Sequence, residues 1–194
     1  MIKLSIIVPI YNGEEFIQQA LDSIPVREDI EVICINDGST DNTLNLLKNY
    51  KRLPIIIYTY DKNMGIGFAT NIGIKASKGE YITGLDIDDC FITDKFNDCL
   101  NLINLKADIY SFPYLRKDGR MWPVRATVGL PSKWIKKSFI GDIKWRTDIR
   151  HAVDYHFLTE LRNKNPNEVF LDKFYYKYNY PREGSMDWKR THEK

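Results

Sequence analysis

Strand-like segments alternate with helix-like segments through the first hundred residues, and this alternation constrains the fold more than any other feature. The apolar runs have the length of strands and recur about every 25 residues, each followed by a polar turn and a segment of helical periodicity. This order is typical of βαβ units, so the sequence predicts an α/β fold with a mainly parallel sheet covered on both faces. We expect strands at residues 4–10, 30–35, 55–60 and in a fourth segment leading into Asp86, and helices at residues 16–24, around 44–47, at 68–76 and at 93–105.

Polar residues directly follow three of these strands, as Tyr11-Asn12, Asp37-Gly38 and Asp86–Asp89. In parallel α/β sheets, ligands bind beyond the carboxyl ends of the strands. The three segments are therefore expected to meet at one rim of the sheet and to form a binding site there.

The last of these segments places three carboxylates, Asp86, Asp88 and Asp89, within four residues. Three carboxylates this close repel one another unless a cation or several hydrogen-bond donors lie among them. Hard oxygen ligands suit Mg²⁺ or Mn²⁺, which often bridge to the phosphates of a substrate. An Asp-rich turn or a helix cap is the alternative reading of the same residues.

The pattern changes after residue 106, although no repeat, linker or low-complexity segment separates the two parts. We therefore predict a single domain, residues 1–194, with two halves, 1–105 and 106–194. In the second half we expect strands at 107–115, 121–128 and 169–180, a hairpin turn at 117–120, a short helix opened by Pro131 that contains Trp134 and Ile135, and a helix at 152–163.

Charge is distributed unevenly along the chain. Residues 1–100 hold 9 Lys and Arg against 15 Asp and Glu, and residues 101–194 hold 19 against 11, so the two parts carry −6 and +8. A solvated surface explains this asymmetry, as does an anionic partner such as an acidic glycan, a lipid headgroup or nucleic acid.

The spacing of the cysteines and the length of the apolar runs indicate where in the cell the protein is expected. Cys34, Cys90 and Cys99 form neither a CxxC pair nor a Cys/His metal spacing, which fits reduced thiols in a cytoplasmic protein. The apolar N-terminus reads as a first strand, and no apolar run is long enough to span a bilayer. We expect a cytoplasmic protein and leave open peripheral contact with the inner face of the membrane.

Three segments in order, SIIVPIYNGEEFI, EVICINDGSTDNT and NMGIGFATNIGIKASKGEYITGLDIDD, resemble the inverting glycosyltransferase family 2, which has the GT-A fold. The resemblance is close over the first hundred residues and looser through HAVDYHFLTELR and FYYKYNYPREGSM. It implies a nucleotide-sugar donor, most often a UDP-sugar, and a divalent metal ion, Mn²⁺ or Mg²⁺. It also implies that residues 1–105 are the nucleotide-sugar-binding half and residues 106–194 the acceptor-binding half.

The resemblance also assigns roles to residues of this sequence. Pro9 and Tyr11 would line the base pocket, and Asp37 would accept the uracil imide N–H. Asp88 would bind the metal directly, Asp86 would face the ribose or the metal's waters, and Asp89 would support this site from behind or cap the next helix. The remaining donor-site residues that the resemblance implies are Asn12, Asn63, Asn71 and Ile87.

Inversion needs a single in-line displacement, in which a carboxylate removes the proton of the attacking hydroxyl. The resemblance places this base at Asp154, although an ordinary Asp near a helix start is the alternative. Trp145 and Tyr155 are candidates for stacking on an acceptor, and Trp134 is expected in the core.

The sequence departs from the family pattern at several positions. Thr70 stands where the family has Arg, a loss that Lys62 or Arg182 could replace, and Val153 stands where it has Glu. The late segment lacks the family's usual His and has Pro181 or Arg182 in that neighbourhood, which leaves the third metal ligand open; His151 and His156 read as packed or surface residues.

The leading hypothesis is a metal-dependent inverting glycosyltransferase acting on a saccharide of an envelope or capsule glycan. A glycosyltransferase acting on modified bases of DNA is the second hypothesis, because the basic second half would suit phosphate contacts. An inactive nucleotide- or protein-binding module of the same fold is the third, motivated by Thr70 and Val153.

Overall fold

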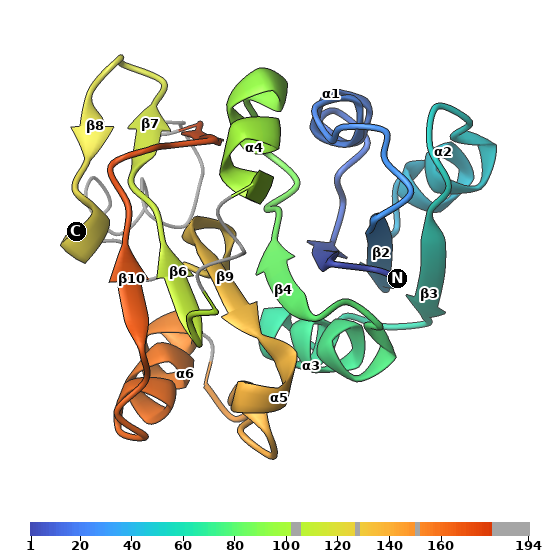
Figure 1. Cartoon of the computed structure of the whole chain (residues 1–194). Coiled ribbons are helices and arrows are strands. Elements are labelled where there is room, and N and C mark those ends of the chain that lie inside the picture. Colours follow the sequence, from blue (N-terminus) through green and yellow to red (C-terminus); the bar gives the residue numbers. More distant parts are fainter. Residues whose placement is uncertain (102–105, 127–128, 150–151, 180–194) are drawn as a thin grey trace.

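The computed structural model describes residues 1–101, 106–126, 129–149 and 152–179 of the 194-residue chain. A seven-stranded sheet runs through the centre, and a second sheet of four strands includes the β7–β8 hairpin at the upper left of Figure 1. In spatial order, the large sheet consists of β10 (Glu168–Phe170), β6 (Ile109–Ser111), β9 (Lys133–Lys136), β4 (Tyr81–Gly84), β1 (Leu4–Ile10), β2 (Ile30–Asp37) and β3 (Ile56–Tyr60), and the small sheet of β5 (Cys90–Phe91), β11 (Tyr176–Tyr178), β7 (Tyr114–Arg116) and β8 (Met121–Trp122).

Parallel pairing dominates the large sheet. β1 pairs in parallel with β2 and β4, β2 with β3, and β6 with β10. β9 runs antiparallel to β4 and β6. The α/β fold and the mainly parallel sheet predicted from the sequence are confirmed, and strands from both halves of the chain share this sheet.

Helices cover both faces of the large sheet (Figure 1). Among the described residues, three helices lie on one face and three lie on the opposite face. The first group is α1 (Ile17–Asp22), α2 (Thr43–Asn49) and α4 (Thr93–Leu100), the second is α3 (Ile66–Ala76), α5 (Lys137–Ile140) and α6 (Val153–Arg162), and two 3₁₀ turns are η2 (Val124–Ala126) and η3 (Leu130–Ser132).

Alternate residues of the central strands β1, β2 and β4 enter two separate cores. In β1, Ile6 and Val8 pack with α1, α2 and α4, whereas Ile7 packs with α3, α5 and α6. All three side chains are fully buried. A strand that is covered on both faces needs apolar residues at successive positions, which is why it reads as a continuous apolar run.

The second half differs from the prediction in detail. The strand expected at 107–115 is divided between β6 and β7, which belong to different sheets, because Pro113 lies between them and cannot donate to a ladder. Pro123 likewise ends β8 after Trp122, where a strand to residue 128 was expected. The strand expected at 169–180 is divided into β10 and β11.

The helix expected around Trp134 and Ile135 was wrong. The turn that contains Pro131 ends at Ser132, and the following residues form β9. Trp134 enters one core and Ile135 the other, which is the alternation of a strand between two layers. The expectation that Trp134 is a core residue is confirmed, since it is 0% exposed.

Candidate active site

Hydrogen bonds join the loops that follow β1 and β2. Asn12 adopts a left-handed backbone conformation, φ 51°, and its Oδ1 accepts the Thr40 N–H at 2.8 Å. The Asn12 N–H in turn donates to the Ser39 hydroxyl at 3.0 Å, and the Gly13 N–H donates to Thr43 Oγ1 at 2.8 Å. Asn12 thus holds the two loops together, a role that the sequence pattern did not reveal.

Asp37 anchors the loop that follows β3. Its carboxylate is 3% exposed and accepts the Met64 N–H at 2.9 Å and the Gly65 N–H at 2.7 Å. The next residue, Gly38, has φ +71°, and a Cβ there would lie 2.3 Å from the Lys62 carbonyl carbon. Both oxygens of Asp37 therefore hold backbone, and its expected contact with uracil stays a prediction.

The Asp86–Asp89 segment contacts the loop after β1. A Cβ on Gly13 would lie 2.9 Å from Ile87 Cγ1, so glycine allows the two loops to touch. Together with the bonds of Asn12, this contact confirms the predicted convergence of the segments after β1, β2 and β4. Tyr11 lies at this rim with 49% of its surface exposed, which leaves its ring available for stacking.

The three aspartates occupy different environments. Asp86 and Asp88 are half-buried, whereas Asp89 is 2% exposed. Asp89 accepts the Tyr176 hydroxyl and, at 2.6 Å, the Asn179 N–H. Burial, reinforced by the charges of Asp86 and Asp88, raises the pKa of Asp89 well above its usual value. Asp89 therefore binds β11 and the residue Asn179 that follows it, and it does not cap α4, whose first turn follows Ile92.

Asp86 and Asp88 form the candidate metal site. Within the described ranges no three His, Cys, Asp or Glu side chains are placed to hold an ion. Mg²⁺ is commonly bound by one or two carboxylates plus substrate phosphates, so two half-buried carboxylates at a rim fit a metal that arrives with a diphosphate. Pro181, Arg182 and His151, considered for the remaining contacts, lie outside the described residues.

The 3₁₀ turn η3 connects this rim to Asp154. At the end of β4, a Cβ on Gly84 would lie 3.3 Å from the Leu130 side chain. At the start of the same turn, a Cβ on Gly129 would lie 3.8 Å from Asp154 Oδ2. Asp154 is in the first turn of α6, where the helix dipole favours a carboxylate, and its Oδ1 accepts the Tyr155 N–H at 2.9 Å.

Trp145 is a core residue, and its predicted role as an acceptor contact was wrong. It is 5% exposed, and its ring lies 5.3 Å from that of Phe157. Its neighbours Lys144 and Arg146 suggested a polar loop, but Asn71 of α3 holds the Trp145 backbone inward. The Asn71 amide donates to the Trp145 carbonyl at 2.8 Å and accepts its N–H at 2.9 Å.

Both ends of the Asn71 amide bind the Trp145 backbone. The expected role of Asn71 in the donor site stays a prediction. Asn63 follows Lys62 in the loop that packs on Gly38. Tyr155 is 55% exposed, and its role as an acceptor contact stays a prediction.

Lys133, a buried charged residue, was not predicted from the sequence, although a Lys within the apolar strand KWIK is a signal for it.

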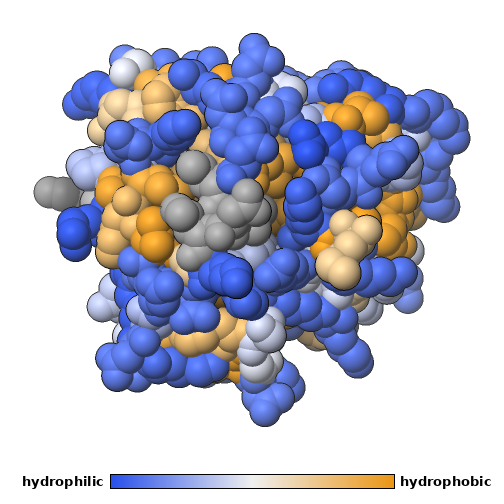
Figure 2. Space-filling view, in the orientation of Figure 1, coloured by the Kyte–Doolittle hydropathy of each residue, from blue (hydrophilic) through white to orange (hydrophobic). Residues whose placement is uncertain are grey.

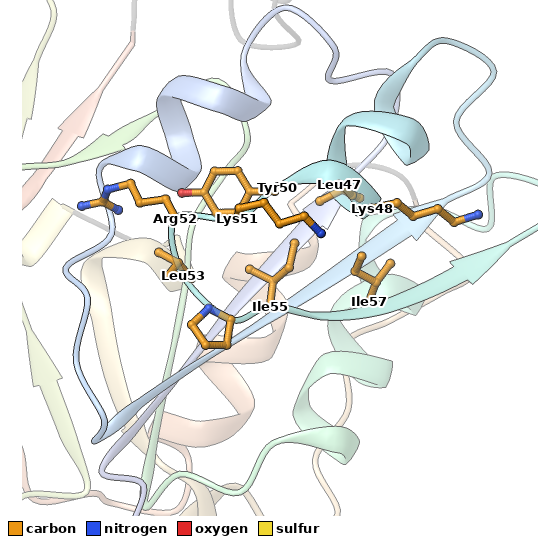
Figure 3. Close-up of a pocket in the computed structure, with 9 residues that line it drawn as sticks. Leu47, Lys48, Tyr50, Lys51, Arg52, Leu53, Ile55 and Ile57 are labelled. Carbon is orange, nitrogen blue, oxygen red and sulfur yellow. The ribbon is translucent and has the colours of Figure 1, made fainter.

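A cavity of about 400 Å³ lies elsewhere, between the end of α2 and the start of β3 (Figure 3). The rim of the sheet is at the other end of β3, so this cavity is separate from the candidate site. The face drawn in Figure 2 is mostly hydrophilic, with hydrophobic residues in separate patches. Among the described residues, no helix is both long and apolar enough to cross a bilayer.

The model of the family described as Glycosyl transferase family 2 matches residues 5–162. The chain belongs to glycosyltransferase family 2. The match runs from β1 to the end of α6 and so includes the rim loops, the aspartate segment and Asp154.

Proteins named as glycosyltransferases resemble this chain in sequence, and a solved structure resembles it in fold. It is 40% identical over 103 residues to an uncharacterized glycosyltransferase of Rickettsia typhi, with 52% of this chain and 32% of the relative covered. It is 40% identical over 94 residues to the poly(ribitol-phosphate) beta-glucosyltransferase of Bacillus spizizenii, with 45% of this chain and 15% of the relative covered.

The crystal structure of S. aureus TarS 1-349 in complex with UDP-GlcNAc matches with a TM-score of 0.84 and 27% identity, over 95% of this chain and 60% of that one. The predicted GT-A fold is thereby confirmed. The chain spans a third or less of the length of the two relatives named above and about three fifths of the TarS chain.

Proposed function

We propose that this glycosyltransferase transfers a sugar from a UDP-sugar to an acceptor hydroxyl, with inversion and with a divalent metal ion. The observation that carries the proposal is the convergence of an exposed Tyr11, the Asp37 loop and the Asp86–Asp88 pair at one rim. The TarS structure, similar over 95% of this chain, binds UDP-GlcNAc, which supports a UDP-sugar as the donor.

Each part of the donor matches a group at the rim. The exposed ring of Tyr11, with Pro9 beside it in β1, offers a stacking surface for the base. Asp86 would accept ribose hydroxyls or metal-bound waters, and Asp88 would hold Mn²⁺ or Mg²⁺ against the diphosphate. When bound, the ion supplies Lewis-acid stabilisation of the leaving diphosphate.

Asp154 is the proposed general base. Its half-buried carboxylate stands at the helix start with Gly129 beside it, and the missing side chain there leaves room for an approaching hydroxyl group. The hydroxyl proton would pass to the carboxylate as the oxygen attacks the anomeric carbon and the diphosphate leaves. Val153, which replaces the family's Glu, is 6% exposed and packs in the core, so Asp154 alone presents a carboxylate from this pair.

The proposed acceptor is an anionic glycan of an envelope or capsule. The net charge of +8 in the second half favours an anionic chain, and the B. spizizenii relative is named for a phosphate-containing polymer. The DNA hypothesis loses one of its supports, because Trp145 is buried and Arg146 pairs with Asp148.

Release of UDP from UDP-GlcNAc and UDP-glucose, measured with and without poly(ribitol phosphate) and with Mn²⁺, tests this function. We expect turnover that the polymer increases, and a loss of at least about a hundredfold in kcat for Asp154→Asn with UDP binding retained. Asp148→Asn, an exposed aspartate held by Arg146, is the matched control and should keep its activity. Equal turnover by wild type and Asp154→Asn would refute the assignment of the base, and UDP binding without turnover of any donor would favour the inactive module.

A further inference from the structure

A buried polar cluster lies between the large sheet and α6, on the same side as Asp154. Its centre is Lys133 of β9, which is 1% exposed. The neighbours of Lys133 in the strand show its direction, because Trp134 enters the core of α4 and Ile135 that of α6. By the alternation of a strand, Lys133 faces α6. Ser111 of β6 is its cross-strand partner.

Two acidic and two basic groups share this cluster. Arg162 near the end of α6 binds Glu168 of β10 through both its Nε, at 2.8 Å, and its Nη2, at 2.7 Å. Glu168 also accepts the Ser111 hydroxyl. Arg162 thus balances the charge of Glu168, and Asp154 is the second acidic group that acts on Lys133. The four charges sum to zero when Asp154 is a carboxylate, and a buried ammonium requires such compensation.

The turn η3 connects the Lys133 ammonium to the neighbourhood of Asp154. Lys133 Nζ donates to Ser132 Oγ at 3.0 Å, and that hydroxyl donates to the Gly129 carbonyl at 2.9 Å. The Ser132 N–H donates to the same carbonyl at 3.2 Å. Since a Cβ on Gly129 would lie 3.8 Å from Asp154 Oδ2, this bonded turn forms one wall beside the carboxylate.

The electrostatics of Lys133 agree with this geometry. Burial lowers the pKa of Lys133 to about 7, and the positive charge of Arg162 contributes to this decrease. The negative charges of Glu168 and Asp154 act in the opposite direction and raise it. Attraction between two titrating groups is reciprocal, so a charged Lys133 favours the ionised form of the Asp154 carboxyl to the same extent.

We propose that Lys133 is a positioning residue for Asp154: it braces the Gly129–Ser132 turn beside the carboxylate and supplies the buried positive charge that keeps the carboxylate ionised. The inference rests on the proposed function, in which Asp154 is the base. A base must be ionised to accept a proton, so Lys133 would extend activity toward lower pH.

Direct titration of the lysine tests the coupling without any substrate. In chain labelled with ¹³C at lysine Cε, the NMR signal absent from Lys133→Met belongs to Lys133, and its midpoint is followed in wild type and in Asp154→Asn. We expect the midpoint to fall by about 0.5 pH unit or more in Asp154→Asn, because the carboxylate no longer favours the ammonium. Glu160→Gln, an exposed change on α6, is the control and should leave the midpoint unchanged.

A second arm measures the reverse effect on activity. The pH profile of kcat/KM for UDP release should have its acid limb at higher pH in Lys133→Met, by about 0.5 pH unit or more, with UDP affinity retained. Ser132→Ala, which keeps the charge and removes the bonded link, should lower kcat and leave that limb in place.

The two ideas fail in different ways. The proposed role of Lys133 would be overturned if its titration midpoint were the same in wild type and in Asp154→Asn. It would also be overturned if the acid limb of the kcat/KM profile were the same in wild type and in Lys133→Met. In either case Asp154 could still be the base. Full activity of Asp154→Asn would remove the base assignment itself, whatever the lysine titration shows.

Discussion

Replacing Lys133 by Met should stabilise the folded chain, and the gain should depend on pH. The folded protein holds this lysine at 1% exposure with its pKa lowered from 10.5 to about 7. In the unfolded chain the same group keeps its proton up to the ordinary value. Below pH 7 the Lys133 amine is protonated in both the folded and the unfolded chain. Burial of this cation then lowers the free energy of unfolding by about 5 kcal/mol, the equivalent of the difference between its two pKa values.

The sign of the pH dependence follows from the numbers of bound protons. Between pH 7 and 10.5 the unfolded state binds one more proton at this site than the folded state, so wild-type stability gains about 1.4 kcal/mol per pH unit there. Met at position 133 keeps the apolar volume and has no such slope. We expect the variant to exceed wild type by about 3–5 kcal/mol at pH 6, and by about 3 kcal/mol less than that at pH 9.

Urea unfolding at pH 6, 7 and 9, followed by tryptophan fluorescence, measures this difference. Lys136→Met is the matched control, because Lys136 is in the same strand, is 32% exposed and pairs with Glu80 at 3.8 Å. It should change the unfolding free energy by about 1 kcal/mol or less, with no comparable slope. A Lys133→Met variant that is less stable than wild type at pH 6, or whose difference from wild type does not vary with pH, would refute the reasoning.

Three further changes test the structure around the site. Trp145→Ala should lower the unfolding free energy by about 3–5 kcal/mol because it opens a cavity beside Phe157, and the folded variant should still bind UDP; unchanged stability in denaturant melts would contradict burial. Asn71→Leu should cost about 1–3 kcal/mol for each Trp145 backbone group left without its partner, read from the same melts, and retained stability would mean that other groups satisfy them. Gly38→Ala should force the β3 loop away, since its Cβ would lie 2.3 Å from Lys62, and calorimetry should show weakened UDP binding; wild-type affinity would mean that the loop does not shape the donor site.

The alternation of strands and helices was readable from sequence because each buried strand and each amphipathic helix carries its own local pattern. β1, β2 and β3 lie within about two residues of their predicted ranges, and the carboxyl-end rule predicted that the segments after β1, β2 and β4 lie together. The rule needs only the strand order and direction, so it predicted that the Tyr11-Asn12, Asp37-Gly38 and Asp86–Asp89 segments meet at one rim, but not which side chains touch there.

The errors arose where distant residues decide the environment. Trp145 lies in a charged loop and reads as exposed, but Asn71, 74 positions earlier, fixes its backbone and turns the ring into the core. From sequence alone Lys133 resembles an exposed surface lysine. It is buried because its strand lies between two cores, one containing Trp134 and the other Ile135. Such burial depends on tertiary neighbours that local periodicity does not contain.

Binding of UDP with Mn²⁺ tests the central claim, a metal-assisted nucleotide site at the rim, most directly. Thermal melts with UDP alone, Mn²⁺ alone and both together should show a joint stabilisation of about 3 kcal/mol at a ligand concentration a hundred times Kd. In a chain of this size that corresponds to a rise of roughly 5–10 °C in Tm. Asp88→Asn should abolish the joint effect, whereas the exposed Asp148→Asn should keep it. Stabilisation by UDP that is independent of Mn²⁺ and survives Asp88→Asn would contradict the account, as would the absence of any change in Tm with UDP.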